Sequence, residues 1–264
     1  MRTDTAILRS SWAFFLLLLL AVFSACPSEQ VEDEGARERW ARRFLPFNKR
    51  WLPESTISRK PPKAPMMAIW ELSAYAPGTE PTPEQREAAE ELIRACERAA
   101  RENGWFDFQK GLSDGFTLMR SDRRHFHNQE YLFDDRIVDP EHPEFLMYYQ
   151  TPQGRKLVGF MFYVRQLEDR GPQVAGPLTV WHYHIWSKLN CLRDGIMPVG
   201  PADKSGRCPR QARATYRSPE MMHVWLIDHP AGRFATSMWL NADLVQALVA
   251  KREAADAQPS AETR

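Results

Sequence analysis

Five of the seven histidines lie in three short apolar segments, and their spacing suits metal ligands carried on β-strands. His182 and His184 belong to the run Thr179–Cys191 (TVWHYHIWSKLNC), whose β-branched and aromatic residues predict a strand. Side chains two positions apart on a strand point to the same face, with their backbones about 7 Å apart. Two imidazoles at this spacing can converge on one metal ion.

His223 is a third candidate ligand. It lies in the middle of a second predicted strand, Met221–Ile227, and it shares a face with Met221 and Trp225. If the opposite face points into the core, His223 projects to the same side as the first pair. Three ring nitrogens with one open position form the arrangement of catalytic metal sites rather than of closed structural ones.

His125 and His127 form another same-face pair, which we expect to supply a fourth ligand or to line the pocket. The implied cofactor is a transition metal ion: zinc, copper or iron. Four carboxylates lie near enough in the sequence to act as a general base or to orient the ligands: Glu130, Asp194, Glu220 and Asp228. Two alternatives remain open, a metal-free polar pocket and histidines that pack in the core without forming a site.

The N-terminus resembles a bacterial lipoprotein signal. The apolar run Ala13–Phe23 is too short to span a bilayer comfortably, and Phe23-Ser-Ala-Cys26 matches a lipobox except that Phe23 replaces the usual Leu. The resemblance implies that a signal peptide, residues 1–25, is removed and that Cys26 carries lipid. The protein would then be anchored to a membrane of the bacterial cell envelope, outside the cytosol. The alternatives are cleavage after Ala25, which yields a protein secreted to the periplasm, and an uncleaved anchor.

Three further cysteines follow Cys26. Cys191 and Cys208 flank a loop rich in Gly and Pro, and the extracytoplasmic setting favours a disulfide between them. The alternative is that both thiols are soft metal ligands beside the histidines. Cys96 lies on the apolar stripe of a predicted helix, so we expect it to be a buried free thiol.

One globular domain is predicted at 67–256, after a linker at 26–66 and before a disordered tail at 257–264. The chain is 43% hydrophobic and 26% charged, which is ordinary for a globular protein. Its net charge of +1 gives no electrostatic case for nucleic acid as a partner.

The predicted fold class is α+β. It consists of a mostly antiparallel sheet or partial barrel with one long packed helix, Pro83–Asn103, and a short C-terminal helix, Ala242–Ala255. Strands at Glu144–Gln150 and Lys156–Arg165 are expected to form a hairpin, because Thr-Pro-Gln-Gly between them is a turn sequence. A turn at Gly232 is expected to enter a final strand.

The order of residues across 83–238 resembles that of a family of secreted bacterial proteins. The pattern is Trp181-His-x-His184, Cys191, Cys208-Pro, Met222-His223-Val-Trp225 and Pro230-x-Gly232-x-Phe-Ala235. The resemblance implies that the two Trp/His motifs and the two cysteines belong together, and it implies no particular reaction. The sequence therefore predicts a lipid-anchored extracytoplasmic metal-binding protein, with enzymatic activity left open. The alternative is a non-catalytic envelope lipoprotein whose Trp/His pocket binds a small molecule or a protein partner.

Overall fold

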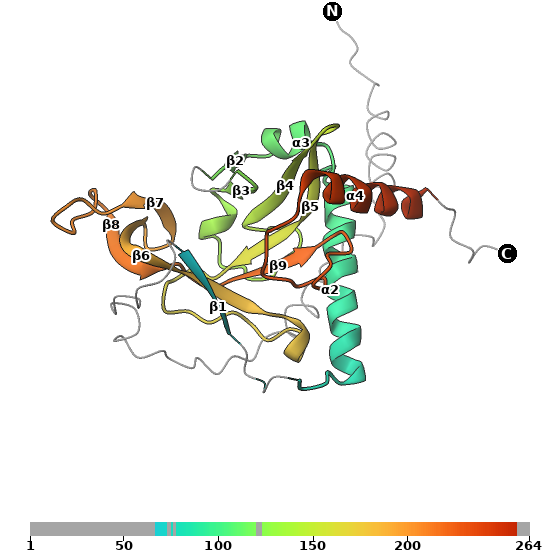
Figure 1. The fold of residues 1–264 in the computed structure, drawn as a ribbon, viewed down its shortest axis with the longest axis horizontal. Coiled ribbons are helices and arrows are strands. Elements are labelled where there is room, and N and C mark those ends of the chain that lie inside the picture. The colour runs from blue at the N-terminus through green and yellow to red at the C-terminus, as the bar shows by residue number, and fades with distance from the viewer. Residues whose placement is uncertain (1–66, 73–74, 76–77, 120–122, 258–264) are drawn as a thin grey trace, which may run out of the picture. The chain divides into compact units, whose positions relative to one another are not determined.

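The computed structural model describes residues 67–72, 75, 78–119 and 123–257 (Figure 1). The predicted signal peptide, the lipid site at Cys26, the linker up to residue 66 and the tail from residue 258 lie outside the described residues. Within the described ranges, no helix is both long enough and apolar enough to cross a membrane.

The fold is α+β and is built on an antiparallel sheet. The strand order is β1-β6-β9-β5-β4-β3-β2, and β7 and β8 pair with β6. The end strands β1 and β2 do not pair with each other, so the sheet is open and not a closed barrel. The strands are β1 (Met67–Leu72), β2 (Phe116–Leu118), β3 (His125–Asn128), β4 (Phe145–Thr151), β5 (Gly154–Tyr163), β6 (Trp181–Arg193), β7 (Met197–Pro201), β8 (Ala212–Arg217) and β9 (Met221–Trp225). The helices are α2 (Pro83–Glu102), α3 (Phe108–Ser113) and α4 (Ala242–Asp256), with short 3-10 helices η2 (Tyr131–Phe133) and η3 (Gly176–Leu178).

Strands β4 and β5 form the predicted hairpin. Strand β4 ends at Thr151 and β5 begins at Gly154, whose φ of 97° is costly for any residue with a side chain. Strand β5 lies between β4 and β9, and its residues from Leu157 onward are buried. This central position agrees with the apolar character of both of its faces.

Helix α2, the long helix predicted from the sequence, begins with a capping box. The Thr82 hydroxyl accepts a hydrogen bond from the Gln85 N–H (3.3 Å), and the Gln85 side chain accepts one from the Thr82 N–H (2.9 Å). Helix α3 begins at Phe108 with Asp107 as its N-cap, and Trp105 just before it is buried edge-on against Phe116 at 5.4 Å between ring centres. The buried residues of α2 form one stripe: Ala88, Ala89, Leu92, Cys96, Ala99 and Ala100.

The sheet is strongly curled. His125 on β3 and His223 on β9 are three strand steps apart in the pairing order, which is about 14 Å in a flat sheet. Their ring centres are 5.6 Å apart, so both side chains point into a concave face. Gly159 lies between them on β5, where a Cβ atom would meet the carbonyl oxygen of Val224 at 2.5 Å. The close approach of β5 and β9 at this bend thus requires glycine.

Residues 226–240 run along the concave face, and we call them the covering loop. The predicted final strand after Gly232 is wrong, because no strand forms there. Strand β9 pairs with β5 along its length but with β6 only at Met221, and the loop does not add a strand to the edge that remains. It is held instead by single contacts, such as the hydrogen bond from the Trp225 N–H to the Arg233 carbonyl oxygen (2.8 Å). Helix α4 follows, with Asn241 as its N-cap.

The segment between Cys191 and Cys208 is more ordered than a simple loop. Strands β7 and β8 pair with the distal half of β6, and we call residues 188–213 the arm. The predicted disulfide is present, with a Cα–Cα distance of 5.5 Å, which leaves neither thiol available as a metal ligand. A disulfide of this kind indicates an oxidising, extracytoplasmic location. Cys96 is the buried free thiol that the helix pattern predicted.

Candidate metal centre

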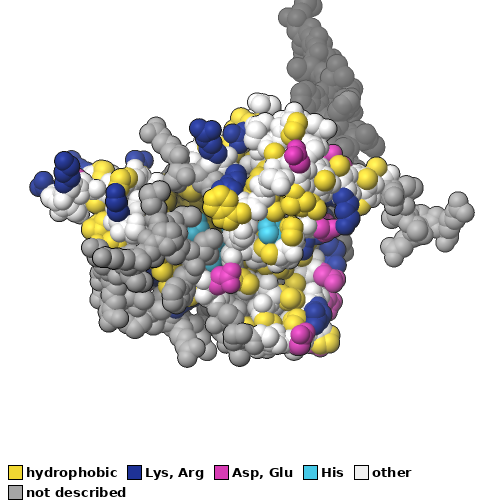
Figure 2. Space-filling view, viewed as in Figure 1, with side chains coloured by type: hydrophobic (Ala, Val, Ile, Leu, Met, Phe, Trp, Pro, Cys, Tyr) yellow, Lys and Arg dark blue, Asp and Glu magenta, His cyan; other side chains and the backbone are white. Residues whose placement is uncertain are grey.

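Four of the five predicted ligands come together on the concave face. The ring centres of His182 and His223 are 4.8 Å apart. His125 lies 5.6 Å from His223, and His184 lies 5.9 Å from His182. The four side chains come from β3, β6 and β9, and the curl of the sheet is what brings these strands within reach of one another. Figure 2 shows small patches of histidine surface on the face that it presents.

The inner three rings are removed from solvent. His125, His182 and His223 are 2%, 0% and 1% exposed, whereas His184 is half-buried and forms the rim. Apolar side chains of the covering loop and of α4 pack in one cluster with the strand residues of this face. Each inner ring faces a methionine across the strand pair: His125–Met147, His223–Met161 and His182–Met221.

The protonation pattern of His223 is fixed by the covering loop. Its Nδ1 donates a hydrogen bond to the Ala235 carbonyl oxygen at 3.1 Å, so the proton lies on Nδ1. Its Nε2 is buried and has no hydrogen-bond partner among the described residues. Burial, reinforced by the nearby His182 and His125 rings, lowers the pKa of His223 well below 6.5. The ring is therefore neutral, with an uncommitted lone pair on Nε2.

His182 has less support than His223. Neither of its ring nitrogens makes a hydrogen bond within the described part of the chain, although the Val180 backbone lies near enough to favour the protonated ring slightly. Burial, followed by the charge of a protonated His184, lowers the pKa of His182 to about 3. An unsatisfied buried polar group costs about 1–3 kcal/mol. Native structures usually complete such groups with water or an ion.

His127 does not join the cluster. Its Nε2 lies 3.3 Å from the hydroxyl of Thr117 on β2. The strand register places Phe145 and Met161 between His127 and His223 in one row across the sheet. The structure therefore brings His125, but not His127, to the other rings.

The four carboxylates that were candidates for a general base lie elsewhere. Glu220 and Asp228 form ion pairs with basic side chains, at 2.7 and 2.6 Å. Glu130 and Asp194 are exposed. None of the four lies within hydrogen-bond distance of a cluster histidine in the described ranges. A general base drawn from this set is thus not supported by their positions.

Glu71 is the carboxylate that sequence reasoning missed. The register of β1 against β6 places Glu71 directly opposite His182, so the two side chains share a face. Its Oε1 accepts a hydrogen bond from the Thr236 hydroxyl of the covering loop at 2.6 Å. Nothing in the local sequence marks this lone acidic residue in an apolar run. Only the strand pairing could reveal it.

In the described part of the chain, no group of three or more His, Cys, Asp or Glu side chains has the geometry to hold a metal ion as it stands. The rings are neighbours, but their nitrogens are not turned toward one point. Comparisons with protein-family models, with curated protein sequences and with solved structures find no match. The function of the cluster therefore has to be argued from its own geometry.

Proposed function

We propose that this protein binds one transition metal ion outside the cytosol, with His125, His182 and His223 as the inner ligands and His184 at the open side. Lipid on Cys26 holds it at a membrane. The main support for the metal site is the hydrogen bonding of His223. Its Nδ1–H donates to the Ala235 carbonyl oxygen, while its Nε2 is buried and has no hydrogen-bond partner in the described residues.

This arrangement of His223 is the one that metal-bound histidines usually have. A ligating imidazole donates its second N–H to a backbone carbonyl or a carboxylate, which fixes the tautomer and aims the other nitrogen at the ion. In this protein the hydrogen bond to the Ala235 carbonyl oxygen already fixes the tautomer of His223 before any metal binds. His182 offers two further nitrogens without partners in the described residues, directly beside His223.

The ring spacing supports the same conclusion. A ring centre lies about 3.2 Å from a metal bound at one of its nitrogens, so two rings at a tetrahedral angle are about 5 Å apart. The spacings within the cluster are 4.8, 5.6 and 5.9 Å. His223 thus lies within this range of both His125 and His182, so a bound ion would be held from His223 outward, with side-chain rotation turning the neighbouring nitrogens toward it.

The chemistry of the donors narrows the choice of metal. Imidazole ligands in a pocket lined by methionine favour copper or zinc, while magnesium and calcium require several oxygen ligands. The three methionines that face the inner rings give copper a further advantage, because thioether sulfur suits Cu(I). Glu71 and the half-buried His184 border the side from which an ion or substrate would enter.

Metal content tests the proposal. Untagged protein purified from the periplasmic or membrane fraction is stripped, offered Zn, Cu and Fe in turn, and assayed by elemental analysis. We expect about one equivalent of one metal per chain. His182→Ala and His223→Ala should each lower the affinity by at least about tenfold, since each removes a ligand.

Three histidines outside the cluster provide matched controls. His142 pairs with Asp134 at 2.8 Å, His229 lies in the turn after β9, and His127 is held by Thr117. Their Ala variants should keep the metal. Uptake by the wild type of less than about a tenth of an equivalent of every metal offered would contradict the proposal, because a three-nitrogen site fills at micromolar ion or below.

A further inference from the structure

The arm carries a concentration of positive charge that the metal site does not use. Residues 188–213 contain six basic and two acidic residues, a net charge of +4, whereas the whole chain carries +1 and the remainder therefore −3. All eight of these charged side chains are exposed. The basic ones are Lys188, Arg193, Lys204, Arg207, Arg210 and Arg213.

Most of these basic side chains form no ion pair with another described residue. Arg207 lies 3.5 Å from Asp203, and Arg213 pairs with Glu168 at 2.6 Å. The other four basic side chains form no ion pair within the described residues: Lys188, Arg193, Lys204 and Arg210. Figure 2 shows dark-blue side chains on the arm, which Figure 1 places at the end of the sheet away from α2 and α4.

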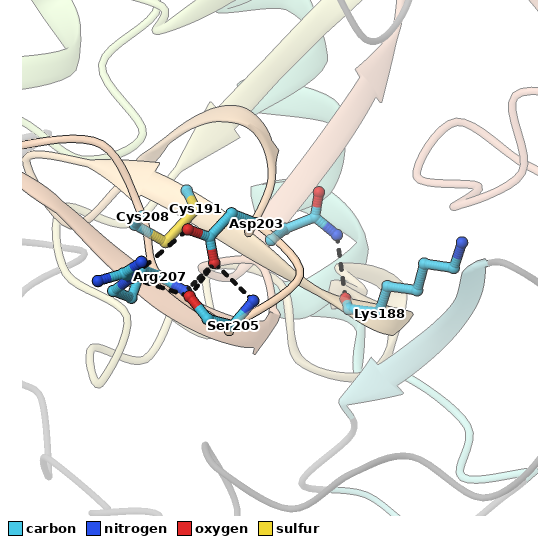
Figure 3. Close-up of a disulfide and its surroundings, with 7 residues drawn as sticks. Lys188, Cys191, Asp203, Ser205, Arg207 and Cys208 are labelled. Atoms are coloured by element: carbon cyan, nitrogen blue, oxygen red, sulfur yellow. Dashed lines mark hydrogen bonds and ion pairs between the residues drawn. A yellow bond between two sulfur atoms is a disulfide. The ribbon is translucent and has the colours of Figure 1, made fainter.

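The arm is also rigid, which lowers the entropic cost of binding. The disulfide joins Cys191 on β6 to Cys208 (Figure 3). Between them, one carboxylate oxygen of Asp203 accepts hydrogen bonds from the Ser205 N–H and the Arg207 N–H, both at 2.8 Å, and from the Ser205 hydroxyl at 2.6 Å. The basic side chains are thus carried on a fixed frame and not on a loose loop.

The composition of the arm points to a partner that is recognised by charge. Residues 188–213 contain no Phe, Tyr, Trp or His. Proteins that bind single-stranded nucleic acid or glycans usually stack exposed aromatic side chains on the bases or sugar rings, and the arm has no aromatic side chain to do so. Anionic lipid headgroups require no aromatic side chains, since clusters of Lys and Arg bind them through charge alone.

We propose that the arm binds the anionic phospholipid headgroups of a membrane surface. Each Lys or Arg near such a surface adds binding free energy, and the four that form no ion pair in the described part of the chain act together. The remainder of the chain, with a net charge of −3, is repelled by the same surface, so binding orients the domain with the arm toward the bilayer. The inference rests on the arm alone and is independent of the metal site.

Vesicle flotation tests this inference on the chain carrying Cys26→Ser, which cannot be lipidated. We expect it to float with vesicles that contain phosphatidylglycerol, to stay unbound with pure phosphatidylcholine, and to dissociate as salt is raised. One basic residue is worth about fivefold in partitioning. Changing Lys188, Arg193, Lys204 and Arg210 together to Gln should therefore reduce binding well over tenfold.

A charge-matched control separates a local site from net charge. Changing four basic residues elsewhere to Gln lowers the net charge equally and should leave binding nearly unchanged: Arg86, Arg94, Lys110 and Arg136, all of them ion-paired. An equal loss in both variants, or binding to neutral vesicles, would overturn the inference. Tighter binding to an anionic polysaccharide or to DNA than to vesicles of equal charge would overturn lipid as the partner.

Discussion

Several ionisable side chains are buried in this domain, and each destabilises the fold unless a partner or a change in protonation compensates. Glu144, just before β4, is 2% exposed, and its carboxyl accepts a hydrogen bond from the Tyr163 N–H at 3.2 Å. Burial raises the pKa of Glu144 well above 4.5, and the backbone hydrogen bonds offset this only in part. The carboxyl is therefore neutral in the folded chain at pH values where the unfolded chain ionises it.

Glu144→Gln should make stability less dependent on pH. Because the folded pKa is raised, the contribution of Glu144 is complete below about pH 4.5 and declines by about 1.4 kcal/mol per pH unit as pH rises toward the folded pKa. Urea unfolding of both proteins between acidic and neutral pH checks this: the variant should gain on the wild type as pH rises. Glu130→Gln, at an exposed site, controls for the change of charge. A difference that stays constant with pH would contradict the assignment.

Single residues also show how far the sequence could predict the site. Alternation along strands correctly placed His182 with His184 and predicted the face of His223, because the period of a strand is a local property. It could not separate His125 from His127, since that choice depends on how far the sheet curls. Glu71 was missed for the same reason: its position opposite His182 depends on a pairing between strands more than a hundred residues apart.

At the level of elements, the curl of the sheet positions the candidate site. The helix start at Thr82 and the hairpin at Thr151–Gly154 were predictable, because caps and turns are encoded within a few residues. The curl was not, because it depends on contacts between strands, and the close approach of β5 and β9 at Gly159 is not evident from a lone glycine in a strand, which has several structural explanations. Strand β7 (MPVGP) escaped prediction because its Pro and Gly residues are typical of loops, and β8 (ARATYR) because it has no run of apolar residues.

Gly159→Ala should destabilise the domain by about 2–3 kcal/mol, because the new methyl group overlaps the backbone oxygen of Val224, which cannot rotate away. It should also weaken metal binding by moving β5 from β9, between His125 and His223. Thermal unfolding and metal uptake provide the two measurements.

Gly78→Ala is the comparison for this change. Gly78 has a φ of 79°, and a Cβ atom added there would meet no other atom within 4 Å, so its substitution costs backbone strain alone, about 1 kcal/mol. It should leave metal uptake intact. Equal losses of stability in the two variants, with normal metal uptake in both, would mean that the β5–β9 contact at Gly159 does not control the curl.

For the whole molecule, the proposed metal site and the proposed lipid-binding arm lie in different places and depend on different interactions. The histidine cluster lies inside the concave face, where burial lowers the pKa of His182 and of His223 and keeps both rings neutral. The arm is exposed and acts through charge that salt screens. A lipid on Cys26 would add a third interaction with the membrane, one that depends on buried hydrocarbon and is insensitive to salt.

Cys26→Ser should release the protein from membranes only when salt is high. The acyl chains attached to Cys26 hold the wild type through hydrophobic burial, worth about 0.8 kcal/mol per CH₂ group. Without them the arm remains, and at about 0.5 M salt its attraction is screened beyond about 4 Å. Membranes from cells that express each form are washed at low and then at high salt, and the pellets are immunoblotted. We expect the wild type to remain in the pellet throughout and the variant to leave it in the second wash.

Two outcomes would contradict lipid anchoring, and each points to one of the other fates of the N-terminus. A Cys26→Ser protein that stays in the pellet at high salt is held by its uncleaved apolar segment, Ala13–Phe23, since the arm is screened under those conditions. A wild type that is found in the soluble periplasmic fraction has been cleaved after Ala25 and carries no lipid. Mass spectrometry of the mature N-terminus distinguishes the three forms directly, because only the lipoprotein begins at Cys26 with added acyl mass.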